Sequence, residues 1–372
     1  MEEKGHPATR KRRILLATIA AIIATAVSSI AAEVLLRVLD LAPTQRIRSA
    51  NRQEFSSLPG IYAPDQSIVA RHVPALPHRV TINGLGYRGK NFPLSKPPGE
   101  IRILMTGDSF TFGDLVDDDK TLPYQLEELL RARCAPIRII NAGLAGSTID
   151  AQSELIERAT DLKPDIVVLV FHENDLLDLT ASIWPKLTAN RELTSRFPMS
   201  FILQALHGTA IYNVAKKAEF RFRELTKNDP FSAKPSAEIE RQNLNRIKAE
   251  YAQRLLQIRD RLRSRSVDFI FALFPSYLHV GPPKVARPDR SDTVDWYDRA
   301  IVLWAEQTAR QMGIPTLNLE SGLYGGLASV EEGYLLPHDA HPSAKGYRIA
   351  AENFANFPPM LDAVSRKCTA PQ

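Results

Sequence analysis

Three residues far apart in the sequence, Ser109, Asp339 and His341, have the side chains needed for nucleophilic catalysis. A serine hydroxyl is a poor nucleophile until a base removes its proton. Asp339 stands two residues before His341, so its carboxylate could orient the imidazole and stabilise the charged ring, leaving the other ring nitrogen to face the serine. The set therefore predicts acyl-transfer chemistry at a serine.

Two further residues could stabilise the oxyanion that such chemistry creates. Gly143 offers a backbone N–H that a bound oxygen can approach closely, and the side-chain amide of Asn174 could donate to the same oxygen. The backbone N–H of Ser109 would be the third donor. Each motif alone also has a plainer interpretation, such as a helix cap or a turn glycine. Their occurrence together, in one order along the chain, favours a single pocket.

Alternating apolar and amphipathic segments from residue 101 onward predict the elements that position these residues. The apolar runs are rich in Ile, Val, Leu and Phe, as in strands buried on both faces of a parallel sheet. The runs are 101–107, 137–143, 164–173, 267–275 and 314–320, and helical periods cover 121–133, 148–162, 237–264, 294–312 and 343–356. This order predicts an α/β fold, a three-layer α/β/α domain with a five-stranded, mainly parallel sheet. Ligands of such sheets bind beyond the carboxyl ends of the strands, where the polar motifs lie.

With these blocks in place, the chain resembles the SGNH hydrolases of the GDSL esterase and lipase superfamily over about residues 80–357. Ser109 in GDSF, Gly143 in NAG, Asn174 in END and His341 in DAHP match the four blocks in order. The resemblance implies Ser109 as nucleophile, His341 as base and then acid, and Asp339 as the residue that orients it. It implies an oxyanion hole of Ser109, Gly143 and Asn174, and no cofactor.

The chain departs from the pattern of the family at two positions. Many members have the acid three residues before the histidine, but His338 stands there, so Asp339 must act from two residues away. The third block usually has glycine two residues before the asparagine, and this chain has His172. The segment 83–89, NGLGYRG, is similar to one found just ahead of the serine block in membrane-anchored members.

A metal site is an alternative use of the polar residues near Asn174 and His341. His172, Glu173, Asp175, His338, Asp339 and His341 are all potential ligands. No HExxH motif or comparable ligand spacing accompanies them, so we expect no metal.

The N-terminus has the pattern of a membrane anchor. The first 13 residues carry a net charge of +3, and the uncharged run 14–32 would span about 28 Å as a helix. We expect residues 1–13 to form a cytoplasmic arm and 14–41 a transmembrane signal-anchor helix with its extension, which places the rest of the chain outside the cytoplasm, on the periplasmic side. The alternative is a signal peptide cleaved near Ala32, which would release a secreted protein.

The remaining segments complete the predicted organisation. Residues 42–100 are expected to form an irregular stalk packed on the catalytic domain, with a short hairpin at 81–89. The catalytic domain would cover 101–357 and carry an inserted cap at 176–235, because sixty residues exceed a simple crossover. Residues 358–372 are expected to form a C-terminal tail. The basic run 216–223 is interpreted as a solvated helix face or a contact with an anionic polymer.

Charge and cysteine content exclude further classes of protein. The net charge of +5 falls to +2 once the first 13 residues are set aside, so we expect no nucleic-acid partner. Only two cysteines occur, Cys134 and Cys368, which excludes a disulfide framework and a cysteine-rich metal site. They could pair in an oxidising compartment, but we interpret them as two separate thiols.

Taken together, the motifs predict a membrane-anchored, extracytoplasmic serine ester hydrolase that acts through an acyl-enzyme intermediate. Its expected substrate is an acylated small molecule or a cell-envelope glycan, and nothing indicates its protein partners. Two alternatives remain open at this point: an O-acyltransferase that passes an acetyl group to a cell-envelope polysaccharide, and a non-catalytic envelope binding protein on the same fold.

Overall fold

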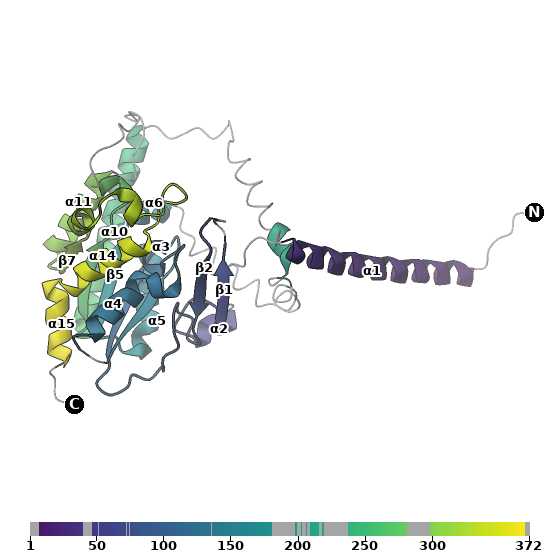
Figure 1. Cartoon of the computed structure of the whole chain (residues 1–372), viewed down its shortest axis with the longest axis horizontal. Coiled ribbons are helices and arrows are strands. Elements are labelled where there is room, and N and C mark those ends of the chain that lie inside the picture. The colour runs from purple at the N-terminus through teal and green to yellow at the C-terminus, as the bar shows by residue number, and fades with distance from the viewer. Residues whose placement is uncertain are drawn as a thin grey trace, which may run out of the picture. The chain divides into compact units, whose positions relative to one another are not determined.

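The computed structural model describes residues 7–39, 47–50, 52–71, 73, 75–134, 136–180, 198, 202, 206, 209–215, 218, 237–280 and 298–368. The chain divides into two compact units (Figure 1). Unit 1 comprises Met1–Gln45 and Pro198–Ser232, and unit 2 comprises Arg46–Phe197 and Ala233–Gln372.

Unit 1 is built on the long helix α1 (Pro7–Val38), drawn in purple in Figure 1. Its span Arg12–Val38 is long and apolar enough to cross a membrane, and its side chains from Arg12 on are almost all exposed. Glu33 accepts hydrogen bonds from the backbone N–H groups of Ala210 and Ile211, at 2.9 and 3.1 Å. Most of the predicted cap lies outside the described residues, and its described residues from 198 to 218 group with α1 in this unit.

Unit 2 contains the predicted five-stranded sheet, which is confirmed and entirely parallel. Its strands are β3 (Ile101–Gly107), β4 (Ile137–Gly143), β5 (Ile166–Phe171), β6 (Asp268–Leu273) and β7 (Thr316–Asn318), in the order β4-β3-β5-β6-β7. Every residue of β3 and β5 is buried. Such burial requires cover on both faces of the sheet, which explains why these strands read as continuous apolar runs.

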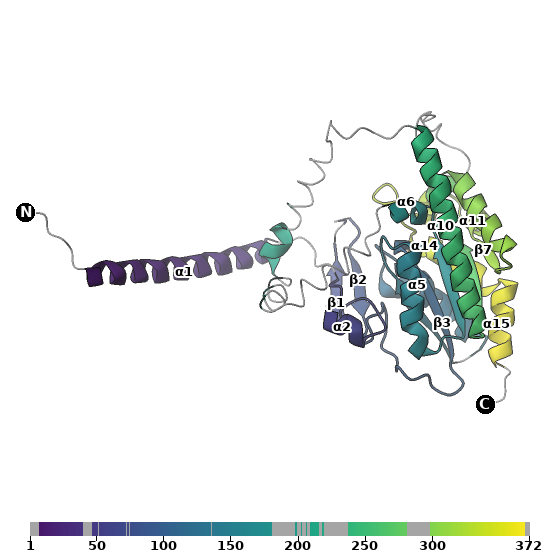
Figure 2. The same cartoon turned by 180° about the vertical axis from the view of Figure 1, so that it is seen from behind.

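Helices cover both faces of the sheet and create two hydrophobic cores. Ile103 and Met105 point to one core, with α4 (Leu122–Arg131), α12 (Glu320–Gly326), α14 (Ala344–Ala355) and α15 (Pro358–Cys368). Leu104 points to the other, with α5 (Ile149–Arg158), α10 (Ala237–Ser264) and α11 (Arg299–Gln311). Figures 1 and 2 show the two helical layers from opposite sides. The three-layer α/β/α prediction is therefore confirmed.

The segment before the sheet is more regular than the stalk interpretation implies. It contains α2 (Arg52–Ser57), β1 (Gln66–Ala70) and β2 (His78–Ile82), and β1 pairs antiparallel with β2. Residues 81–89 form a short antiparallel hairpin of their own: Ile82 and Arg88 form a bridge, and the backbone N–H groups of Gly89 and Asn83 donate to the carbonyls of Thr81 and Tyr87, each at 2.9 Å. The longer strand partner of β2 is β1, which lies upstream and was not predicted.

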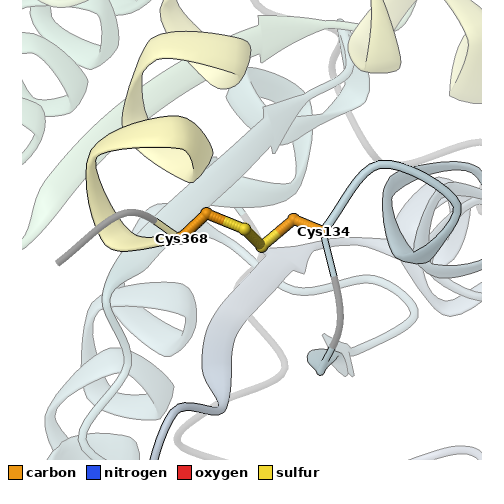
Figure 3. Close-up of a disulfide and its surroundings, with 2 residues drawn as sticks. All are labelled: Cys134 and Cys368. Carbon is orange, nitrogen blue, oxygen red and sulfur yellow. A yellow bond between two sulfur atoms is a disulfide. The ribbon is translucent and has the colours of Figure 1, made fainter. Parts of the chain in front are cut away.

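The C-terminal end differs from the sequence-based expectation in two ways. Residues 358–368 form helix α15, in which Met360, Ala363 and Val364 are buried at helical spacing. Two prolines in its first turn suit a helix start, where no intrahelical N–H donor is needed. Cys134 and Cys368 form a disulfide with their Cα atoms 6.2 Å apart (Figure 3), so the interpretation as two separate thiols is wrong. The bridge joins residues 234 positions apart, which spacing along the chain cannot reveal.

Candidate active site

The ends of three neighbouring strands bring the predicted site residues to one edge of the sheet. Gly107, the last residue of β3, is paired with Gly143 of β4 on one side and with Val170 of β5 on the other. Ser109 follows β3, and Asn174 follows β5 as the first residue of α6 (Asn174–Thr180). In parallel sheets this carboxyl edge is the usual place for a ligand site.

A tight turn presents Ser109 at the start of the short helix α3 (Ser109–Phe112). Asp108 caps this helix, because its carboxylate accepts a 2.9 Å hydrogen bond from the backbone N–H of Phe110. Position 107 requires glycine, because the Cβ atom of any other residue would lie 2.2 Å from Thr111 Oγ1. Asp108 is fully buried and therefore supports the turn, whereas Ser109 keeps 8% of its surface exposed.

Ser109, His341 and Asp339 form one continuous hydrogen-bonded row. His341 Nε2 lies 2.8 Å from Ser109 Oγ, and His341 Nδ1 lies 2.5 Å from Asp339 Oδ1. Asp339 Oδ1 also accepts a 2.9 Å bond from the backbone N–H of His341, which fixes the carboxylate against the ring. Asp339, two residues before His341, therefore reaches Nδ1 of the ring. His338 is exposed and takes no part in this hydrogen-bonded row.

The charges around His341 favour its protonated form. Burial lowers the pKa of His341, but the hydrogen bond and the charge of Asp339 outweigh it and raise this pKa above its ordinary value. Burial likewise raises the pKa of Asp339, but the hydrogen bond with His341 brings it below the usual range. Asp339 is thus held as a carboxylate, which can stabilise the imidazolium that forms when His341 accepts a proton.

A paired loop segment carries His341. The backbone N–H of Leu335 donates to the carbonyl of His341 at 2.9 Å, and Tyr334 forms a bridge with Pro342. Beyond it, Ser343 caps α14 by accepting a 3.1 Å hydrogen bond from the Gly346 N–H. The imidazole is therefore fixed from both ends of its loop.

The structure does not support Gly143 as an oxyanion donor. Its N–H already donates a 3.0 Å hydrogen bond to Asn141 Oδ1, and a Cβ atom at this position would lie 2.1 Å from the backbone nitrogen of Phe112. Gly143 is thus a close-packing residue between β4 and α3. Three residues later, Gly146 has φ +67°, and its N–H has no hydrogen-bond partner among the described residues.

Asn174 and His172 lie at the wall of the site formed by the end of β5. Asn174 is half-buried at the start of α6. His172, which replaces the glycine usual in the resembling family, is buried, and its ring stacks on Phe110 with the ring centroids 3.7 Å apart. Where the family usually has glycine, His172 therefore supplies a ring that packs on Phe110, next to Ser109.

Arg88 supports the loop that follows Ser109, a role that the family motifs did not indicate. Its side chain is 1% exposed and donates to the carbonyls of Phe112, Gly113 and Val116, at 3.0, 2.6 and 2.7 Å, and to Asp118 at 2.9 Å. The sequence contains a sign of this role, because Arg88 is the single charged residue in the glycine-rich segment 83–89. A buried guanidinium needs several acceptors, and the backbone of a tight loop supplies them.

Among the described residues, no three His, Cys, Asp or Glu side chains are placed to hold a metal ion. Asp339 and His341 belong to the row with Ser109, whereas His172 and Glu173 pair with each other. The potential ligands therefore divide between two networks.

Residues 105–349 match the model of the GDSL-like lipase/acylhydrolase family. No protein of curated function matches the chain. Similar solved structures include a lipase/acylhydrolase from Enterococcus faecalis (14% identity, 72% of this chain and 96% of that chain, TM-score 0.40) and a catalytic mutant of an acetylxylan esterase from Geobacillus stearothermophilus (17%, 70% and 95%, 0.39). A third is a G-D-S-L lipolytic family member from Veillonella parvula DSM 2008 (13%, 68% and 95%, 0.37).

Proposed function

Because the chain belongs to the GDSL-like lipase/acylhydrolase family and is thus an ester-bond hydrolase, we propose that it cleaves an O-acyl ester through an acyl-enzyme intermediate on Ser109. The observation that carries the proposal is the row Ser109–His341–Asp339, with 2.8 and 2.5 Å between the polar atoms. This geometry suits removal of the hydroxyl proton by Nε2 while Nδ1–H stays bound to the carboxylate.

The reaction follows in two balanced steps. Ser109 Oγ attacks the carbonyl carbon as its proton passes to His341 Nε2, and the ester C–O bond breaks as His341 gives that proton to the leaving oxygen. Water then attacks the acyl group on Ser109, passing one proton to His341. The carboxylic acid leaves, and the proton returns to Ser109 Oγ. Asp339 stays ionised throughout and stabilises the imidazolium.

The oxyanion of each tetrahedral intermediate needs hydrogen-bond donors beside Ser109. We assign the Ser109 N–H and the Asn174 side chain to this role, as the sequence predicted. In place of Gly143, whose N–H is occupied, we assign Gly146, which lies in the loop after β4. Ser147 beside it donates to the carbonyl of Gly107 at 3.1 Å, which ties this loop to the nucleophile turn.

Two features support a membrane-anchored, extracytoplasmic enzyme. The apolar part of helix α1 is long enough to cross a bilayer and follows the basic residues 10–13, which by the positive-inside rule stay in the cytoplasm. Unit 2 contains the Cys134–Cys368 disulfide, and disulfides persist in oxidising compartments. Mass spectrometry of the mature chain tests the anchor: we expect an intact N-terminal region, whereas a chain beginning near Ala32 would indicate signal cleavage and secretion.

Hydrolysis of p-nitrophenyl acetate by the purified full chain, compared with Ser109→Ala, tests the activity. We expect the variant to lose at least about 10³-fold in kcat, because the nucleophile itself is removed. It should keep the circular dichroism spectrum of the wild type. Full activity in this variant would refute the assignment. A parallel assay with an oligosaccharide acceptor separates hydrolysis from acyl transfer, since a transferase would form acylated sugar in preference to acetate.

A further inference from the structure

A buried carboxylate next to the site takes no direct part in the proposed reaction. Glu173 is fully buried at the end of β5, and its two oxygens lie 2.8 Å from His172 Nδ1 and 2.8 Å from His279 Nε2. The backbone N–H of Ser276 donates to the same carboxylate at 3.2 Å. Glu173 thus joins β5 to the segment after β6 that contains the short 3-10 helix Tyr277–His279.

The pKa of this carboxylate is lowered despite its burial. Burial raises the pKa of Glu173, but the charge of His172 and the 2.8 Å contacts with His172 and His279 outweigh it and bring the pKa well below the usual range. Burial lowers the pKa of His172, and the charge of Glu173 outweighs it and raises this pKa. A buried ion pair is costly to form, and removing one partner leaves the other uncompensated. The cluster therefore ties the end of β5 to the segment after β6.

The cluster touches the segments that carry the proposed catalytic groups. Glu173 directly precedes Asn174, and the backbone N–H of Asp175 donates to the His172 carbonyl at 2.9 Å. The His172 ring stacks on Phe110, the residue after Ser109. On the opposite side, Pro275 accepts a 2.7 Å hydrogen bond from Tyr334 Oη, and Tyr334 is bridged to Pro342 beside His341.

We propose that Glu173 is a positioning residue that holds the oxyanion donor Asn174 in register with Ser109 and His341. It does so by clamping His172 and the Ser276–His279 segment between the strand ends. The inference rests on the proposed function, because it gives Asn174 its role in the oxyanion hole. A small displacement of such a donor costs activity without changing the fold.

A purely structural role for this ion pair predicts different behaviour, and the chain offers a matched comparison. Arg102 and Glu100 form another buried ion pair, 2.7 Å apart, at the amino end of β3 and away from the proposed site. Replacing Glu100 by Gln removes a buried charge of the same kind. If Glu173 only contributes stability, Glu173→Gln and Glu100→Gln will both unfold at a lower temperature. Below that temperature, both variants will then have the kcat of the wild type.

The experiment measures kcat and KM for p-nitrophenyl acetate with the full chain, together with thermal unfolding, for Glu173→Gln, Glu100→Gln, Asn174→Ala and the double variant Glu173→Gln/Asn174→Ala. We expect Glu173→Gln to lower kcat about tenfold to 100-fold with KM changed less than about twofold. In the Asn174→Ala background the same substitution should change kcat less than about twofold, because the donor that it positions is gone. Glu100→Gln should keep kcat.

Two further variants, at His279, test the same inference if the Glu173→Gln protein does not fold. His279→Ala removes one partner of Glu173 and should lower kcat, whereas His279→Gln retains an N–H donor and should restore at least half of the loss. Additive effects of Glu173→Gln and Asn174→Ala, or equal kcat in the Glu173→Gln and Glu100→Gln variants, would overturn the inference while leaving the proposed function intact. An active Ser109→Ala variant or an inactive wild type would overturn both.

Discussion

At the level of single residues, the catalytic row is the part of the site that sequence reasoning located best. Ser109, Asp339 and His341 carry distinctive side chains in short motifs, and the structure places them in hydrogen-bond contact. Their chemical roles stay predictions until measured. Gly143 is the residue that the sequence could not distinguish from its neighbour. The segment 141–146, NAGLAG, contains two glycines, and the structure shows that the N–H of Gly143 donates to the Asn141 side chain.

The pH dependence of activity should report the pairing of His341 with Asp339. As a general base His341 must be neutral, so kcat/KM rises with pH through its pKa, which Asp339 raises above the ordinary value of 6.5. In Asp339→Asn the raising charge is absent, so the acidic limb of the pH profile should move to lower pH. We also expect kcat to fall about 10³-fold to 10⁴-fold, since the ring loses its orienting partner.

Steady-state kinetics of both proteins between pH 5 and pH 9 provide the measurement. Asp119→Asn is a suitable control, because Asp119 is an exposed carboxylate whose partner is Lys120. An acidic limb that stays in place in Asp339→Asn, or moves to higher pH, would contradict the assignment of Asp339.

At the level of elements, the strength of the apolar pattern decided what could be predicted. The five strands and the helices between them were located within a few residues, because strands buried on both faces leave continuous apolar runs. The pairing of β1 with β2 was not predicted, because the segment between these two strands has no distinctive turn motif, whereas the glycines of 83–89 mark the short hairpin that follows β2. Helix α15 was missed because its two leading prolines read as a break in structure.

Arg88, in the glycine-rich segment 83–89, should stabilise the loop that follows Ser109. Its guanidinium donates to three backbone carbonyls between residues 112 and 116, and without it the carbonyls of Gly113 and Val116 lose this donor, while Phe112 keeps a hydrogen bond from Asn141. We expect Arg88→Met to lower the free energy of unfolding by about 3–5 kcal/mol. Urea unfolding gives this value, and Arg79→Ala, at an exposed position of β2, should change it by less than about 0.5 kcal/mol. Equal stabilities of the two variants would show that Arg88 does not hold this loop.

At the scale of the whole molecule, the sequence located the apolar N-terminal helix and the α/β sheet but not the long-range links within each unit. The described residues between 198 and 218, part of the insertion 176–235 that the sequence predicts as a cap, group with α1, where Glu33 accepts hydrogen bonds from the N–H groups of Ala210 and Ile211. Contacts between residues 177 positions apart leave no periodic signal in the sequence. The same reason hid the pairing of Cys134 with Cys368.

The Cys134–Cys368 disulfide should stabilise unit 2 by restricting its unfolded chain. It closes a loop that includes every strand of the central sheet from β4 onward, and a loop of this length corresponds to about 2–5 kcal/mol. We expect each of Cys134→Ser and Cys368→Ser to lower the melting temperature, with a larger effect at Cys134, which is buried in the core while Cys368 is exposed. The double variant should fall no further than Cys134→Ser, because both changes break the same bond. A reducing agent should lower the melting temperature of the wild type and leave the variants unchanged. A wild type indifferent to reduction, or a double variant in which the two losses add, would show that the two sulfurs act separately.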